Sequence, residues 1–389
     1  MFRENYGARD GRQSLVLSPE LRLLLCCTSL NPSDSELAET QRMLAVPIQW
    51  ESFPELARHH GVAALAFRAL KEETTLPEPV KARLCAFAKK TAVANLRFIH
   101  ELLTLNELCR DQHLALMPYK GPALSTIIYG DPAVRDTSDL DFLIQPKDLA
   151  RLTQLLRARG YVPEQRIATH PDSDYLSKVS ECEFAHPEAG IRIDVHWNIA
   201  PGHLGMTVDP DWFWERTSQV SLNGVTMPAM RAEKLVLALC IHGAKHAWER
   251  LKWICDLGNL LRANPRLDWS EISNAANQSG AERALGLGLR MAYHLFAAPL
   301  PHGYGFDAST EALAQHCLEI LHDSAADQSS ARRRWLFLWQ LQPGWRNKAK
   351  AVKRFLAEPE IGAGQPSVAP LSIASWRRLV RVANVMIRN

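Results

Sequence analysis

The sequence predicts an α+β protein, in which a small mixed sheet lies between an N-terminal and a C-terminal helical region. Two patterns indicate this class. Apolar residues recur every three to four positions before residue 115 and again after about residue 228, as they do in amphipathic helices. Between these stretches, short apolar runs alternate with short helical patterns. We therefore expect four regions: N-terminal helices in 1–115, an α/β core in 116–200, a helical domain in 201–330 and a basic helical tail in 331–389.

The composition argues against several classes of protein. The chain has 389 residues, and its apolar content is ordinary for a folded soluble protein. Its eight cysteines are scattered and include no C-x-x-C pair, which argues against a zinc ribbon and a secreted disulfide scaffold. The N-terminus lacks the apolar stretch of a signal peptide, and no run reaches the roughly 18 to 20 apolar residues of a membrane span. We therefore expect a cytoplasmic protein.

The first region reads as helices. Ser18 is a candidate N-cap, followed by Pro19 at the first helical position and Glu20 in the first turn. The segments "SDSELAETQRMLA", "SFPELARHHGVAALAFRALKEE" and "KTAVANLRFIHELLTLNELCRD" continue the helical periodicity.

The core alternates strands and helices. "ALMPYKG" is a short apolar run, "PALSTIIYG" a short helix, "DLDFLI" a strand, and "PKDLARLTQLLRARG" an amphipathic helix that ends at Gly160. "VSECEFAHPEAGIRIDVHWNI" reads as a hairpin across the turn "PEAG". In its second arm the polar residues share one face: Arg192, Asp194, His196 and Asn198.

The helical domain opens with a candidate polar cluster. "RAEKLVLALCIHGAKHAWERLKWICDLGNLLRAN" reads as one long helix, on which His242 and His246 share a face and Asp256 lies within about 40° of His242. The segment lacks the Glu of a zinc-binding H-E-x-x-H motif. We interpret these three residues, together with His196, as polar groups that line a cleft or form a buried network.

The tail concentrates positive charge. Residues 331–389 hold twelve Lys or Arg against two Glu, whereas the net charge of the whole chain is only +3. Three tryptophans, Trp335, Trp339 and Trp345, suit either packing on the core or binding to nucleic acid or an anionic membrane. Because the other 330 residues carry a net negative charge, we expect the tail to dock on the protein itself. A membrane surface is the alternative, and nucleic acid is not an expected partner.

Two carboxylates at the start of the strand "DLDFLI" indicate a metal site. Asp139 and Asp141 are two residues apart, so in a strand they point to the same face and repel each other. Mg²⁺ relieves such repulsion, and it binds one or two carboxylates together with substrate phosphates. If the strand that carries Asp194 is a neighbour, three carboxylates converge, as in a phosphoryl-transfer site with two Mg²⁺ ions and a nucleoside triphosphate. The alternatives are a polar strand end, or Asp194 paired with Arg192 or His196.

Three residues near these acids suit phosphate binding. Gly121 lets the backbone approach a phosphate, and the helix that follows it presents its N-terminus. Lys120 can neutralise phosphate oxygens. Arg135 can bind phosphate through two hydrogen bonds, or it can instead form a salt bridge with Asp131 or Asp136.

The segment "MPYKGPALSTIIYGDPAVRDTSDLDFLI", with "IRIDVHWNI", resembles the uncharacterised nucleotidyltransferase-like family of the DNA polymerase β superfamily. "WESFPELARHHGVAALAFRAL", "NLRFIHELLTLNELC" and "CIHGAKHAWERLKWICDLGNLL" extend the likeness over most of residues 20–262. The resemblance implies a nucleotidyltransferase fold with metal-binding acids at Asp139, Asp141 and Asp194. That superfamily usually has Gly-Ser where this chain has Lys120-Gly121.

Two functions fit these observations. The first is an enzyme that moves a nucleoside monophosphate from an NTP to a hydroxyl of a small molecule, sugar, peptide or protein and releases pyrophosphate, with Asp194 helping to deprotonate the acceptor. The second is a catalytically inactive adaptor on the same fold. A decayed site would be expected to lose a carboxylate, and all three are present, so the sequence favours the enzyme.

Overall fold

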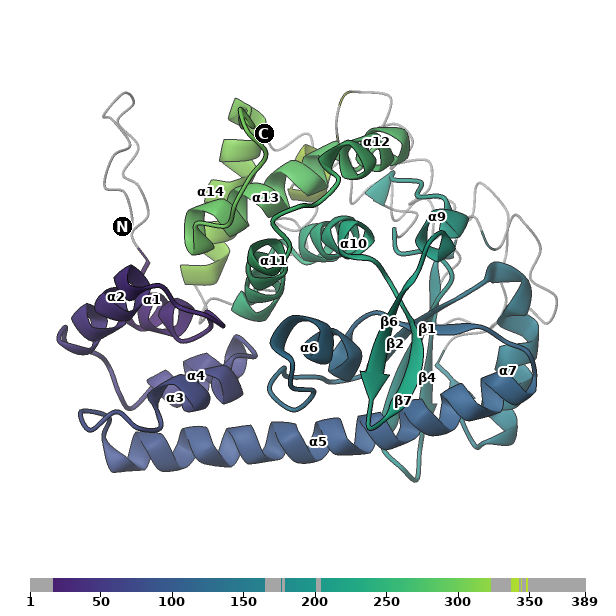
Figure 1. Ribbon diagram of the computed structural model, residues 1–389, viewed down its shortest axis with the longest axis horizontal. Coiled ribbons are helices and arrows are strands. Elements are labelled where there is room, and N and C mark those ends of the chain that lie inside the picture. Colours follow the sequence, from purple (N-terminus) through teal and green to yellow (C-terminus); the bar gives the residue numbers. More distant parts are fainter. Residues whose placement is uncertain are drawn as a thin grey trace, which may run out of the picture.

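The computed structural model describes residues 17–164, 176, 179–200, 204–322, 337–342, 344 and 348. The fold is α+β, as the sequence predicts, with a mixed five-stranded sheet, a separate two-stranded sheet and helices grouped around them (Figure 1). Most of the predicted basic tail, including Trp335 and Trp345, lies outside the described residues. None of the described helices is long and apolar enough to cross a membrane.

The N-terminal region is helical, as predicted. Its helices are α1 (Pro19–Cys26), α2 (Asp34–Leu44), α3 (Phe53–His59), α4 (Ala63–Leu70) and α5 (Glu78–Asp111). The predicted start of α1 is confirmed, since the Ser18 side chain accepts a hydrogen bond from Leu21 N and Pro19 occupies the first turn. The turn after α1 packs on the C-terminal helices, because Asn259 donates to the Thr28 carbonyl and accepts from Leu30 N.

Helix α5 connects two hydrophobic cores. It has 34 residues, so it is about 50 Å long and runs along one side of the molecule (Figure 1). Val80 and Leu84, near its start, join the core formed by the N- and C-terminal helices. Leu102 and Leu105, near its end, join the core of the sheet. One helix therefore ties the N-terminal helices to the sheet.

The five-stranded sheet brings distant segments together. Its strands are β1 (Leu116–Pro118), β2 (Leu140–Ile144), β3 (Val162–Pro163), β4 (Glu181–His186) and β5 (Ile191–His196). Their order is β1-β2-β5-β4-β3; β2 and β5 are parallel, and the other pairs are antiparallel. The β4–β5 hairpin turns across residues 187–190, as the motif "PEAG" predicts. Helix α6 (Gly121–Tyr129) follows β1, and α7 (Leu149–Ala158) follows β2 after a 3₁₀ turn (Pro146–Asp148).

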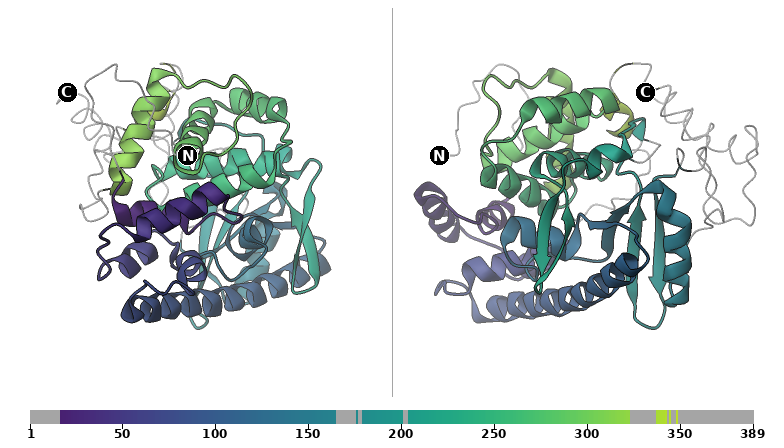
Figure 2. Two further views of the ribbon diagram at one scale, coloured as in Figure 1. Left: turned by 60° about the vertical axis from the view of Figure 1, so that its left-hand side comes forward. Right: turned by 45° about the vertical axis from the view of Figure 1, so that its right-hand side comes forward.

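The two faces of the sheet differ in character. On one face, apolar residues of β2 and β5, such as Phe142 and Ile193, share a core with α5 and α7. Residues of the alternate positions, such as Asp141 and His196, therefore point to the opposite face. The right-hand view of Figure 2 shows α7 lying against the sheet, on the side away from the C-terminal helices. The polar face is thus turned toward the interior of the molecule.

A second hairpin lies in the region assigned to the C-terminal helical domain. Strands β6 (Ser218–Leu222) and β7 (Val225–Ala229) pair across Asn223 and Gly224, which both have positive φ. Asn-Gly is the preferred pair for such a two-residue turn. Val220 and Met227 bury their side chains in the core of the five-stranded sheet. The segment "QVSLNGVTM" carries this hairpin signal, which the assignment of 201–330 to a helical domain left out.

The predicted long helix near residue 242 is two helices. Beyond α9 (Pro210–Trp214), the C-terminal region holds α10 (Ala232–Lys245), α11 (Leu251–Ala263), α12 (Trp269–Ser279), α13 (Glu282–Phe296) and α14 (Ala308–His322). The break between α10 and α11 comes from Ala247 and Trp248, which adopt left-handed φ values of 49° and 53°. Trp248 N donates to the Gly243 carbonyl, and its indole ring is fully buried over Gly243, where a Cβ would overlap it. Burial of this ring offsets the strained backbone.

The first described residues of the tail pack on the helical domain. Phe337 is buried and stacks on His316 of α14, with 5.8 Å between ring centroids. Leu341 is buried in the same core. Docking of the rest of the tail stays a prediction, because residues 349–389 lie outside the described residues.

Candidate active site

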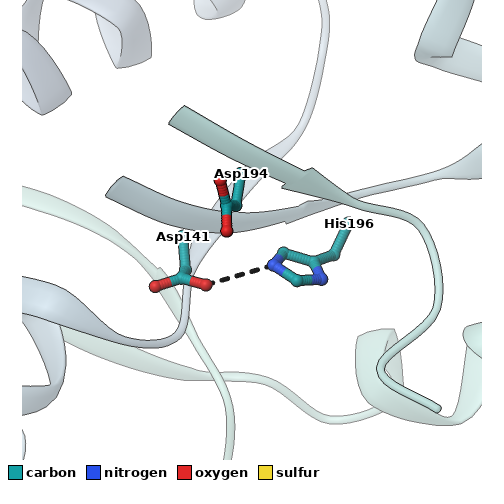
Figure 3. Close-up of side chains that lie close together, drawn as sticks. All are labelled: Asp141, Asp194 and His196. Atoms are coloured by element: carbon teal, nitrogen blue, oxygen red, sulfur yellow. Dashed lines mark hydrogen bonds and ion pairs between the residues drawn. The ribbon is translucent and has the colours of Figure 1, made fainter. Parts of the chain in front are cut away.

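Two carboxylates and an imidazole meet on the polar face of the sheet. The parallel pairing of β2 and β5 places Asp141 directly beside Asp194, and Leu143 beside His196. One ligand atom from each of Asp141, Asp194 and His196 lies within 4.8 Å of the other two. Figure 3 shows these side chains converging from the two strands. Segments more than fifty residues apart in the sequence thus form one cluster.

Asp141 is the most strongly held carboxylate of the cluster. Its Oδ1 accepts from the Lys120 ammonium and lies 3.1 Å from His196 Nε2. Burial alone would raise the pKa of Asp141, but Lys120 and His196 hold it below its usual value. The Asp141 side chain is therefore ionised at neutral pH.

Asp194, in contrast, forms no ion pair with any of the described residues. Its Oδ1 is buried and has no hydrogen-bond partner within the described part of the chain. Burial, and the negative charges of Asp141 and Asp139, raise the pKa of Asp194 to about 7. Two carboxylates side by side, one of them unpaired, are unfavourable unless a proton or a cation compensates them.

Asp139 stands at the edge of the cluster. It precedes the first residue of β2 and is partly exposed. Burial and the neighbouring charge of Asp141 raise its pKa. Its carboxylate is not among the three described ligand groups that lie within 4.8 Å of one another. Of the three predicted acids, the structure therefore pairs Asp141 with Asp194 and leaves Asp139 outside their immediate contact.

His196 lies between Asp141 and Glu181, and Glu181 was not among the predicted site residues. Glu181 Oε2 is 3.1 Å from His196 Nδ1, although the pair is not aligned as a hydrogen bond, and Lys245 Nζ is 2.8 Å from Glu181 Oε1. Tyr119 OH lies 3.4 Å from His196 Nε2. Burial lowers the pKa of His196, but Asp141 and Glu181 outweigh that effect and raise it.

The sequence contains the signal for Glu181. A turn over residues 187–190 pairs His186 with Ile191, and continuing that antiparallel register brings Glu181 opposite His196. No comparable local signal exists for Lys245, which reaches the site from α10.

The chain matches a known protein family over its central part. Residues 47–297 match a family described as "Uncharacterised nucleotidyltransferase". The chain belongs to this nucleotidyltransferase family. The match spans the five-stranded sheet, α6 and the helices from α10 to α13, and so includes every candidate site residue from Lys120 to Asp256. No curated protein matches the chain significantly.

His242 of α10 and the C-cap residue His246 form an aromatic cluster near the carboxylates. His242 and His246 have ring centroids 4.8 Å apart, and both contact Trp253 of α11. Burial and the positive charge of Lys120 lower the pKa of His242 well below its usual range. Neither histidine belongs to a metal-binding group in the described residues. They are neighbours of the cluster rather than part of it.

Asp256 and Arg135 instead form a separate buried ion pair. Arg135 Nε lies 2.8 Å from Asp256 Oδ2, and Tyr129 OH donates to Asp256 Oδ1 at 3.0 Å. The predicted salt bridges of Arg135 with Asp131 or Asp136 were wrong. Asp131 Oδ1 accepts from Ala133 N at 2.8 Å, and Asp136 Oδ2 lies 3.6 Å from Lys252 Nζ. The ion pair of Arg135 and Asp256 connects the loop before β2 to α11.

Lys120 and Gly121 form the junction between β1 and α6. Lys120 is the N-cap residue of α6 in an extended conformation, and Gly121 has a left-handed φ of 61°. A Cβ at Gly121 would lie 3.4 Å from Thr137 Cγ2 and 3.6 Å from the Asp139 carbonyl. Both are ordinary van der Waals distances, so glycine is favoured here by its left-handed backbone and not by a lack of space for a side chain.

Proposed function

We propose that the protein transfers a nucleoside monophosphate from an NTP to a hydroxyl group of an acceptor and releases pyrophosphate. The single observation that carries this proposal is the side-by-side placement of Asp141 and Asp194, with Asp194 Oδ1 buried and unpaired among the described residues. A polyphosphate is itself negatively charged, so carboxylates at its binding site would repel it unless a cation binds between them.

The residues of the cluster fit a divalent cation. Asp141 and Asp194 offer the carboxylate oxygens that Mg²⁺ and Mn²⁺ prefer, and His196 offers an imidazole, which suits transition metals. A bound divalent cation would lower the pKa of the attacking hydroxyl and neutralise charge on the phosphates. The orphaned Asp194 oxygen is the position that such an ion would satisfy.

The transfer itself is a substitution at the α-phosphorus. The acceptor oxygen forms a bond to this phosphorus, the bond from it to the bridging oxygen of the pyrophosphate breaks, and pyrophosphate leaves. The proton of the acceptor hydroxyl needs a base. We assign this role to Asp194, because the cation would lower the pKa of the acceptor hydroxyl and the Asp194 oxygen that does not bind the cation could then accept the proton.

Phosphate binding is best assigned to the start of α6. The helix N-terminus attracts anions, and Gly121 leaves its approach free of a side chain. Arg135 is less suited, because its Nε already binds Asp256 in a buried pair. We assign Arg135 to holding the loop that leads to Asp139.

The proposal is tested by screening the four NTPs with Mg²⁺ or Mn²⁺, measuring thermal shift and pyrophosphate release. One NTP is expected to stabilise the wild-type protein and to yield pyrophosphate, and Asp194→Asn should abolish both effects. Asp268→Asn is the matched control, because Asp268 caps α12 and asparagine caps helices equally well. A protein that no NTP stabilises, with no pyrophosphate released, would support the adaptor function instead.

A further inference from the structure

We infer that the Lys120 ammonium takes the place of one metal ion, so that the carboxylate cluster binds a single divalent cation instead of the expected two. This inference deepens the proposed function and rests on it. It concerns which positive charges compensate Asp141 and Asp194.

The backbone places Lys120 where a cation is needed. β1 pairs with β2 so that Pro118 lies opposite Phe142, and Tyr119 N donates to the Asp141 carbonyl at 3.3 Å. The next residue, Lys120, is therefore adjacent to the Asp141 side chain, and its ammonium contacts Asp141 Oδ1.

The ammonium is enclosed rather than free in solvent. Lys120 is only 8% exposed, and its Nζ lies 4.9 Å from the centroid of the Tyr119 ring. A cation near an aromatic ring is further stabilised by the ring electrons. Lysine is a compact point charge on a flexible stem, which makes it the side chain best able to occupy the position of a small ion.

The ligand groups support one ion. Two metal ions roughly 3.5 to 4 Å apart need carboxylates that bridge them, with further ligands on both sides. Within the described residues the cluster offers three ligand groups, Asp141, Asp194 and His196. Asp141 Oδ1 already accepts from Lys120 and lies 3.1 Å from His196 Nε2. This leaves too few donors for a second ion without displacing Lys120.

The charges lead to the same count. Three carboxylates act on the site electrostatically: Asp141 and Asp194 in the cluster, and Asp139 at its edge, and together they carry three negative charges when ionised. The nearby Glu181 is paired with Lys245, so these two charges cancel. One divalent cation and the Lys120 ammonium supply three positive charges, whereas two divalent cations and the ammonium supply five. A largely buried site is most stable near neutrality, because uncompensated charge is expensive in a low dielectric. We therefore assign one of the two cationic positions to Lys120.

The experiment is a titration of the full chain with Mn²⁺, without nucleotide, in which free Mn²⁺ is followed by electron paramagnetic resonance. The wild-type protein is expected to bind one Mn²⁺ per chain. Lys120→Met keeps the apolar stem and removes the charge, and should bind two. Lys120→Arg keeps the charge and should bind one.

The outcomes separate this inference from the proposed function. Two ions on the wild-type chain, or one ion on Lys120→Met at any affinity, would overturn the role of Lys120 and leave the metal site standing. If neither the wild type nor Asp194→Asn binds Mn²⁺, the proposed metal site is wrong, and the inference about Lys120 fails with it. Lys120→Gln serves as the neutral variant if Lys120→Met does not give a folded protein by circular dichroism.

Discussion

Replacing Asp194 by asparagine is expected to stabilise the metal-free protein at neutral and alkaline pH. The folded protein raises the pKa of Asp194 to about 7 from its usual 3.8. Below pH 3.8 the residue is protonated in both the folded and the unfolded chain, and it contributes no difference. As pH rises from about 4 to 7, the unfolded chain loses this proton and the folded chain keeps it, so the wild-type protein loses stability.

The size of the effect follows from the shift in pKa. Each pKa unit corresponds to about 1.4 kcal/mol, so a shift of about three units gives an upper limit of about 4 kcal/mol. Asparagine remains neutral throughout and avoids this loss. The free energy of unfolding of Asp194→Asn should therefore match the wild type at pH 4 and exceed it by about 2 to 4 kcal/mol at pH 8.

Urea denaturation with a chelator present, repeated between pH 4 and pH 8.5, measures this difference. The control is Asp268→Asn, which should run parallel to the wild type because Asp268 is an exposed N-cap of α12 and asparagine caps helices equally well. Parallel curves for Asp194→Asn and the wild type would refute the reasoning, since they would mean that Asp194 bears no uncompensated charge in the folded protein.

Three further predictions concern the surroundings of the cluster. Adding Mg²⁺ or Mn²⁺ at a hundredfold excess over its Kd should raise the unfolding free energy of the wild type by about 2.7 kcal/mol in isothermal denaturation, and leave Asp194→Asn unchanged. Asp141→Asn should destabilise the metal-free protein by about 3 to 5 kcal/mol in urea, because it leaves the buried Lys120 ammonium without its counter-charge; a stable variant would contradict the ion pair. Arg135→Met should lower the unfolding free energy by about 3 to 5 kcal/mol, because it leaves the Asp256 carboxylate buried without its partner. Calorimetry of the folded variant should show unchanged NTP affinity, and a loss of affinity would mean that Arg135 binds phosphate.

Local sequence patterns alone determined much of the core. Strand alternation places Asp194 and His196 on one face, and the turn "PEAG" sets the register of the hairpin that carries them. The same hairpin register places Glu181 opposite His196, and the Asn223-Gly224 pair indicates the turn of the β6–β7 hairpin. These features depend on contacts between residues close in the sequence, where few alternatives compete.

Only the tertiary structure decided which charges meet. The parallel register of β2 and β5 pairs Asp141 with Asp194 across more than fifty residues, and no local pattern selects one register of two distant strands. The helix break at Trp248 depends on a buried pocket for its indole, and it sends Asp256 to Arg135 instead of the histidines. A charged side chain takes the partner that compensates its loss of hydration, and that choice exists only once the chain has packed.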